Sequence, residues 1–276
     1  MSWFQNAIGL SPKCWTQVSS NEKQEALIEL WRAKIEKILS VTPCYGYRKV
    51  TKALKKIGEI VNHKKIMRIM NTTGLKQKRR KYKPKTTDSR HRLRIFPNII
   101  KNIVPLYPNH LWVGDITYVQ LPSEFCYVAI VLDVFTRKVV GWAIALHMEK
   151  ELVLKALDMA LAIGTPAFHH SDRGGQYCSN DHVERLESVG TKISMADTGV
   201  SVDNPFAESF NRTLKVEEVY LNRYENIEEA KASIGKFIND TYHGKRLHQS
   251  LNYQTPNEFY TSWRLQNPET TIPLLH

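Results

Sequence analysis

The sequence predicts a small all-α domain followed by an α/β domain built on a mixed sheet. Apolar residues recur at helical spacing in the first 75 residues, where glycines separate short segments. From residue 106 onward, three segments rich in β-branched and aromatic residues precede alternating helical and strand-like segments. This order is typical of a mixed sheet flanked by helices. Charge divides at the same place, with 24 Lys/Arg and 6 Asp/Glu in residues 1–105 but 15 and 21 in residues 106–276.

The division predicts two modules with different tasks. A net charge of +18 in residues 1–105 favours binding to a polyanion. Residues 106–276 have a net charge of −6, so we expect this part to have a different task. The length of 276 residues allows about two domains. We expect a helical, helix-turn-helix-like domain over 1–75, a basic linker over 76–105, an α/β domain over 106–265 and a tail over 266–276.

The composition argues against several other classes of protein. No run of 18 apolar residues predicts a membrane span, and the first residues lack the pattern of a signal peptide. We therefore expect a cytoplasmic, nucleoid-associated protein. The four cysteines form no Cys-x-x-Cys pair, which favours reduced thiols over a structural zinc site.

Three helices are expected in the first domain, over 22–40, 47–57 and 62–74, with Asn62 capping the third. The third helix would bury Ile66, Ile69 and Met70 and turn its basic residues outward. Short helices with one basic face fit a DNA-binding helix-turn-helix, although an ordinary solvated bundle is the alternative. The outward residues that we expect to contact DNA are Lys64, Lys65 and Arg68.

A dense basic run follows the helices, with ten Lys/Arg and one acid within residues 76–94. Like charges at this density repel one another, so the run is expected to be extended in the free protein. It could follow DNA phosphates, or it could simply be a solubilising linker. The candidate DNA contacts here are Lys78, Arg79, Arg80 and Lys81.

The second domain is expected to begin with strands over 111–119, 125–133 and 138–146. A helix over about 150–163, a strand over 166–171, a helix over 180–189 and a short strand over 191–195 follow. A further helix starts at Asn204-Pro205, where Asn204 is the expected cap and Pro205 the first helical residue, and Asn226 caps another that runs to about residue 242. Five strands in this order are compatible with an RNase H-like sheet.

Two aspartates stand out in this pattern. Asp115 lies inside a strand that otherwise looks buried, where an ionised carboxylate is costly unless it is paired or binds a metal ion. Asp172 follows the fourth strand and precedes Gly174 and Gly175, at a strand end where open α/β sheets place their sites. Taken alone, Asp115 could bond to backbone and Asp172 could belong to a simple turn.

Glu208 lies one turn into its helix and points away from the apolar stripe of Phe206, Phe210 and Leu214. Asn211, Arg212 and Lys215 share its side. By itself this face could be merely solvated. The three carboxylates together suggest two-metal phosphoryl transfer, and all-oxygen ligands favour Mg²⁺ or Mn²⁺, with two ions expected.

At this point the sequence resembles the Asp-Asp-Glu (DDE) enzymes, which include retroviral integrases and insertion-sequence transposases. Asp172 and Glu208 have 35 residues between them, and Lys215 follows seven residues later. More specifically, the chain resembles the transposases encoded by the second reading frame (OrfB) of bacterial insertion sequences. Over about residues 20–265, the stretches that carry this resemblance include Tyr45–Arg48, Trp112–Tyr118, Leu132–Arg137, His170–Tyr177, Asp203–Asn211 and Tyr242–Leu251.

The resemblance implies an RNase H-like integrase catalytic core for residues 106–265. It implies Mg²⁺-dependent cleavage of DNA at transposon ends and transfer of the freed 3′-hydroxyl to a second phosphodiester. Asp115, Asp172 and Glu208 are the implied metal ligands and catalytic residues, and Lys215 is an implied DNA contact, with Arg212 beside it. Asp133 is expected to be a structural carboxylate that pairs with Arg137 or with backbone.

The resemblance also implies partners, namely double-stranded DNA and further copies of the same chain. A fusion with the product of an upstream reading frame is possible within this family, and the Gly199–Asp203 spacer departs from the family pattern. Two alternatives stay open at this stage. One is an inactive DNA-binding repressor derived from a transposable element, and the other is a nuclease that acts on RNA–DNA hybrids.

Overall fold

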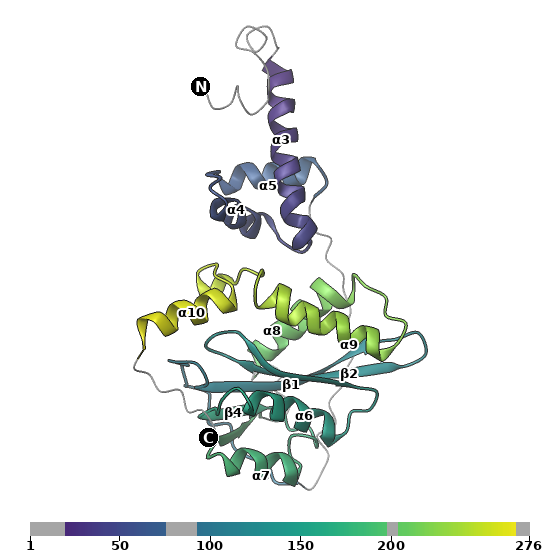
Figure 1. Cartoon of the computed structure of the whole chain (residues 1–276), viewed down its shortest axis with the longest axis vertical. Coiled ribbons are helices and arrows are strands. Elements are labelled where there is room, and N and C mark those ends of the chain that lie inside the picture. The colour runs from purple at the N-terminus through teal and green to yellow at the C-terminus, as the bar shows by residue number, and fades with distance from the viewer. Residues whose placement is uncertain (1–19, 76–92, 198–203, 269–276) are drawn as a thin grey trace. The chain divides into compact units, whose positions relative to one another are not determined.

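The computed structural model of the chain describes residues 20–75, 93–197 and 204–268. They belong to two compact units, one within residues 1–80 and the other within residues 81–276 (Figure 1). The first unit is all-helical and the second contains a five-stranded mixed sheet, so the predicted fold class is confirmed. No helix in the described ranges is both long and apolar enough to cross a bilayer.

The first unit packs α3 (Ser20–Val41), α4 (Tyr47–Lys56) and α5 (His63–Thr72) around one small core. The Asn62 side chain accepts a hydrogen bond from the backbone N–H of Lys64, which is the N-cap that the sequence predicts. Gly58 adopts a φ of 86° in the turn between α4 and α5, a conformation that favours glycine. The buried apolar residues of this core are Trp31, Ile35, Tyr45, Val50, Leu54, Ile66, Ile69 and Met70.

The sheet of the second unit has the strand order β3-β2-β1-β4-β5. β1 (Leu111–Gln120), β2 (Phe125–Asp133) and β3 (Val139–Ala145) form an antiparallel meander, as the three consecutive strand signals predict. β4 (Phe168–Ser171) pairs parallel to β1, and β5 (Lys192–Met195) pairs parallel to β4. The long meander and the two short parallel strands therefore meet at β1.

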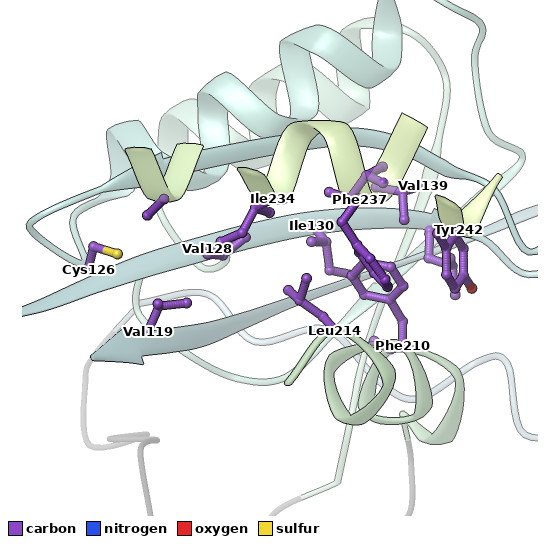
Figure 2. Close-up of a cluster of buried hydrophobic side chains, with 14 of the residues drawn as sticks. Val119, Cys126, Val128, Ile130, Val139, Phe210, Leu214, Ile234, Phe237 and Tyr242 are labelled. Atoms are coloured by element: carbon purple, nitrogen blue, oxygen red, sulfur yellow. The ribbon is translucent and has the colours of Figure 1, made fainter. Parts of the chain in front are cut away.

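Helices cover both faces of this sheet (Figure 1). α6 (Lys150–Leu161) and α7 (Asn180–Ser188) lie on one face, and α8 (Pro205–Leu214) and α9 (Ile227–Lys236) lie on the other. On the face that carries α8, Phe210 and Leu214 belong to one hydrophobic cluster with Ile234 and Phe237 and with the β2 residues Val128 and Ile130 (Figure 2). Because side chains alternate along a strand, β1 contributes Val113 to this cluster. Its neighbour Trp112 faces the opposite cluster.

Several helical segments near the C-terminus were not expected. α8 and α9 each continue into a π-helical segment, Lys215–Val219 (η2) and Phe237–Tyr242 (η3). A single 3₁₀ turn, Gln249–Leu251 (η4), precedes α10 (Pro256–Gln266). π segments are rare and occur often at functional sites. Here η2 begins at Lys215, one of the residues for which a role was predicted.

Part of the segment expected to be a linker belongs to the second unit and packs along its sheet. The backbone N–H of Ile99 donates to Ser194 Oγ at 3.1 Å, and Lys101 pairs with Asp197 at 2.6 Å. Phe96 and Ile100 contact the two hydrophobic clusters of the sheet. Residues 93–104 therefore run along the second unit, and the exact domain boundaries remain a prediction.

Candidate active site

β1 and β4 pair over only three residues of each strand, Leu111–Val113 with Phe168–His170. β1 then continues to Gln120 along β2, whereas β4 ends at Ser171. From Gly114 onward, the edge of β1 that faces β4 therefore has no neighbouring strand among the described residues. Asp115 lies directly after this fork on β1, and Asp172 lies directly after it on β4.

Asp115 is held at the fork by two hydrogen bonds. Its Oδ1 accepts from the backbone N–H of Ile116 at 2.9 Å, and its Oδ2 accepts from Asn211 Nδ2 at 2.8 Å. The first bond satisfies a backbone donor on the unpaired edge, and the second ties the strand to α8. The expectation that Asp115 could bond to backbone is therefore correct, and it does not exclude a ligand role, since each oxygen keeps a lone pair.

Asp172 opens a tight turn after β4. Its Oδ1 accepts from the backbone N–H of Gly174 at 2.9 Å, which is an Asx turn. A Cβ atom on Gly174 would lie 3.0 Å from that same oxygen, so glycine allows the close approach. The turn fixes Asp172 beside the strand that carries Asp115.

Glu208 lies in the first turn of α8 and is exposed, as the helical periodicity predicts. Asn204 begins this helix, but its side chain does not cap it. Instead Asn204 Nδ2 donates to the carbonyl of Gly114 at 2.9 Å, so it binds the unpaired edge of β1. The predicted helix start is correct, and the expected capping role of Asn204 is wrong.

The charges of Asp172 and Glu208 both act on Asp115. Burial and the nearby charge of Asp172 raise the pKa of Asp115 from 3.8 to about 7, with a smaller contribution from Glu208 and opposed by the two hydrogen bonds. Desolvation also raises the pKa of Glu208. Mutual repulsion of this kind is relieved by a bound cation, because its charge favours the ionised forms.

The described residues contain no group of three or more His, Cys, Asp or Glu side chains placed to hold a metal ion. Asp115 and Asp172 approach each other closely enough to interact, while Glu208 stays exposed on the helix above. The donors are all oxygen atoms, which favours Mg²⁺ or Mn²⁺ over zinc. The aspartate pair fits such an ion, and Glu208 on α8 is the further carboxylate whose charge acts on Asp115.

Lys215 reaches the same site from the end of α8. Its Nζ lies 3.9 Å from the centre of the Tyr118 ring, on the β1 strand. Burial lowers the pKa of Lys215, and the charge of Asp115 partly opposes this effect. Lys215 is therefore half-buried beside the carboxylates, whereas Arg212 is exposed on α8.

Asn211 and Tyr118 are the residues of this site that the sequence did not single out. The helical spacing placed Asn211 on the side of Glu208, but the structure buries it against Asp115. The position of Asn211 next to the apolar stripe of its helix was a clue, because a polar side chain at such a position is partly buried and needs a hydrogen-bond partner on the neighbouring element. Nothing in the sequence distinguished Tyr118 from other strand residues, because aromatic residues are common in strands.

The structure also settles how Asp133 is used. Its carboxylate accepts hydrogen bonds from the Thr136 hydroxyl at 2.5 Å and from the backbone N–H groups of Thr136, Phe135 and Asn109. Burial raises its pKa to about 6, and these hydrogen bonds oppose the rise. Of the two expected partners of Asp133, backbone is correct, and no ion pair joins it to Arg137 within the described chain.

The candidate DNA contacts of the first unit lie on α5. Lys64 and Arg68 are exposed, as expected, and Lys65 is half-buried with its Nζ 5.3 Å from the Trp31 ring centre. Lys78, Arg79, Arg80 and Lys81 lie outside the described residues.

Comparison with known proteins identifies the family. Sequence profiles described as "Integrase core domain" match residues 105–201 and 189–256, and one described as "HTH-like domain" matches residues 24–83. The transposase of insertion sequence element IS904 from Lactococcus lactis is 35% identical over 219 residues, which cover 78% of this chain and 87% of that protein. Transposase InsF of insertion sequence IS3A from Escherichia coli is 32% identical over 220 residues, covering 78% and 76%.

Among solved structures, the chain resembles a chain of the simian T-cell lymphotropic virus intasome in complex with the PP2A regulatory subunit B56 gamma. The TM-score is 0.50 at 18% identity, over 88% of this chain and 78% of that one. At this identity the likeness supports the fold alone, and it agrees with an RNase H-like sheet. On the identity and coverage of its sequence relatives, the chain belongs to the insertion-sequence transposases with an integrase-type core.

Proposed function

We propose that this chain cuts DNA at the ends of an insertion sequence and joins the freed 3′-hydroxyl to a second phosphodiester. The observation that carries the proposal is the fork between β1 and β4. It sets Asp115 and Asp172 side by side, with the Asn211 amide of α8 hydrogen-bonded to Asp115. Two repelling carboxylates at a strand fork are costly to maintain unless they bind a cation.

Asp115, Asp172 and Glu208 would hold two divalent ions, Mg²⁺ or Mn²⁺. When bound, such ions activate the attacking oxygen and stabilise the leaving oxygen of a phosphoryl transfer. Asn211 keeps Asp115 oriented, because its amide fixes one carboxylate oxygen. Gly174 plays the same part for Asp172 through its backbone N–H.

Lys215 would bind a DNA phosphate next to the reacting one. Its ammonium is half-buried against the Tyr118 ring and lies near Asp115, so it can face a backbone phosphate that enters the fork. The exposed Lys64 and Arg68 on α5 would contact DNA elsewhere, together with Lys65 and the basic residues 78–81. We further propose that the protein acts as an oligomer, because two transposon ends must be brought together.

The experiment compares Asp115→Asn, Asp172→Asn and Glu208→Gln with wild type in Mg²⁺-dependent cleavage and joining of labelled DNA ends. Each variant should lose at least a thousandfold in rate while it still binds DNA. Glu228→Gln is the matched control, since this exposed glutamate lies on α9 away from the fork. Joining by the Glu208→Gln protein at the wild-type rate would refute the assignment. DNA binding by wild type without any cleavage would instead indicate an inactive, repressor-like protein.

A further inference from the structure

A pair of cations in the turn between β2 and β3 has no part in the proposed site. Arg137 and Lys138 follow the buried carboxylate of Asp133, and the backbone of Arg137 has a φ of 62°. A positive φ is uncommon for a residue with a side chain and needs support from its surroundings. The Asp133 hydrogen bonds and the bond from the Arg137 N–H to the Asp133 carbonyl supply that support. The turn thus holds its two cations in a fixed place.

The Arg137 guanidinium forms no ion pair within the described chain, although the charge of Asp133 is near enough to act on it. It stacks over the Phe206 ring, with Cζ 4.3 Å from the ring centre, and its Nε is buried without a hydrogen-bond partner among the described residues. Asp133 would be its natural counter-ion, but no ion pair forms, because four other donors occupy that carboxylate. A buried guanidinium N–H without an acceptor is costly and therefore calls for a ligand.

Lys138 has a similar environment. Its Nζ lies 5.0 Å from the ring centre of Tyr260 on α10, and no described carboxylate forms an ion pair with it. Burial lowers the pKa of Lys138 and of Arg137, and the nearby charge of Asp133 partly opposes this effect for both. The imidazole beside the turn brings no negative charge, since His243 Nε2 accepts the N–H of Val139. Two neighbouring cations therefore lie half-buried on aromatic rings, within residues 106–276, whose net charge is −6.

We propose that Arg137 and Lys138 form a phosphate-binding site for the DNA backbone, separate from the carboxylates of the fork. A guanidinium binds a phosphodiester through two parallel N–H donors, and stacking on Phe206 fixes the plane in which they lie. Phe206 precedes Glu208 by two residues on α8, so a phosphate bound here would lie close to the start of the helix that carries the third carboxylate. This inference rests on the proposed function, since it assumes that DNA is the substrate.

The test measures DNA affinity as a function of salt, for the full-length chain in EDTA so that cleavage does not interfere. Each lost phosphate contact should reduce the slope of log K against log salt by about 0.9. We expect a reduction of about 1 for Arg137→Gln and about 2 for the variant that also carries Lys138→Gln. Arg137→Lys should keep most of the slope because it keeps the charge. Arg185→Gln is the matched control, since the Arg185 guanidinium is already paired with Asp158.

Two DNA probes identify which phosphates are bound. A duplex that carries the terminal sequence of the element reports on end binding, and a random-sequence duplex reports on target binding. A reduced slope on either probe supports the site and assigns its source. Slopes unchanged on both probes, within the effect of Arg185→Gln, would overturn the proposal. If Arg137→Gln fails to fold, Lys138→Gln alone should still lower the slope by about 1, and an unchanged slope would be equally decisive.

The two proposals can fail separately. A protein that joins DNA with Mg²⁺ but shows unchanged slopes would refute only the phosphate site. A protein that shows the reduced slopes but never cleaves DNA would refute only the proposed catalytic function.

Discussion

Asp115→Asn should stabilise the metal-free protein at neutral and alkaline pH. The pKa of Asp115 is about 7 in the folded chain against an ordinary 3.8. The folded state therefore holds a proton that the unfolded state releases between about pH 4 and pH 7. Stability falls over this window and is then constant, because above pH 7 both states are ionised. Asparagine carries no charge, so the variant avoids the loss.

The expected gain follows from the same values. A difference of about three between the folded and unfolded pKa values of Asp115 corresponds to at most about 4 kcal/mol of unfolding free energy. Asp115 keeps some contact with solvent, which screens the repulsion from Asp172, so we expect about 2 kcal/mol at pH 8 and less at pH 5. The new amide can be accommodated, because the buried Oδ1 of Asn211 has no hydrogen-bond partner among the described residues. If the Asn211 amide turns over, that oxygen accepts from the amide at position 115.

The assay is chemical denaturation of both proteins in EDTA at pH 5 and pH 8, repeated with Mg²⁺. Mg²⁺ should raise the midpoint for wild type but not for Asp115→Asn, because the variant has lost a ligand. Asp133→Asn is the contrasting control. Each Asp133 oxygen accepts from two donors that include fixed backbone N–H groups, so an amide there should be destabilising at both pH values. Equal or lower stability of Asp115→Asn than wild type in EDTA at pH 8 would refute the reasoning.

Two further substitutions test the site and its support. Tyr118→Leu should slow end cleavage about fivefold, because the cation–π contact between Lys215 and the Tyr118 ring is worth about 1 kcal/mol. Tyr118→Phe keeps the ring and should cleave at the wild-type rate. Equal cleavage rates for the two variants would contradict this role of the ring. Gly141→Ala should lower the free energy of unfolding by about 3 kcal/mol, because the new Cβ would collide with the Ala156 carbonyl and with Ala160 of α6. A denaturation midpoint equal to that of wild type would show instead that α6 can move away.

Much of the fold could be predicted because local signals agreed with the tertiary packing. β-branched and aromatic residues indicated the three strands of the meander, and the side chains of Asn62 and Asn226 cap the helices that the sequence assigned to them. α10 was missed, although Thr255 and Glu258 form a capping box around Pro256. Thr followed three residues later by Glu is a common sequence pattern at the start of a helix, so α10 could have been predicted. The π-helical ends of α8 and α9 carry no such signal, since they depend on packing against the rest of the unit.

The site was less accessible to sequence reasoning than the fold. The spacing of Asp172 and Glu208 pointed to both residues, and the position of Asp115 in a buried strand marked it as an anomaly. The sequence could not reveal that the Asn204 side chain bonds to the Gly114 carbonyl instead of capping α8, because this hydrogen bond joins residues 90 positions apart. The pairing of Asn211 with Asp115 likewise depends on how α8 crosses β1, and helical periodicity fixes only the face and not the partner.

The fork between β1 and β4 also bears on solubility. A strand edge with free N–H and C=O groups is a template for pairing with another chain and hence for aggregation. At this edge the Gly114 carbonyl is occupied by the amide of Asn204, and the Ile116 N–H by the carboxylate of Asp115. Lys215 adds a charge beside Tyr118 on the same strand. Asn204, Asp115 and Lys215 thus keep a second β-strand from docking on this edge.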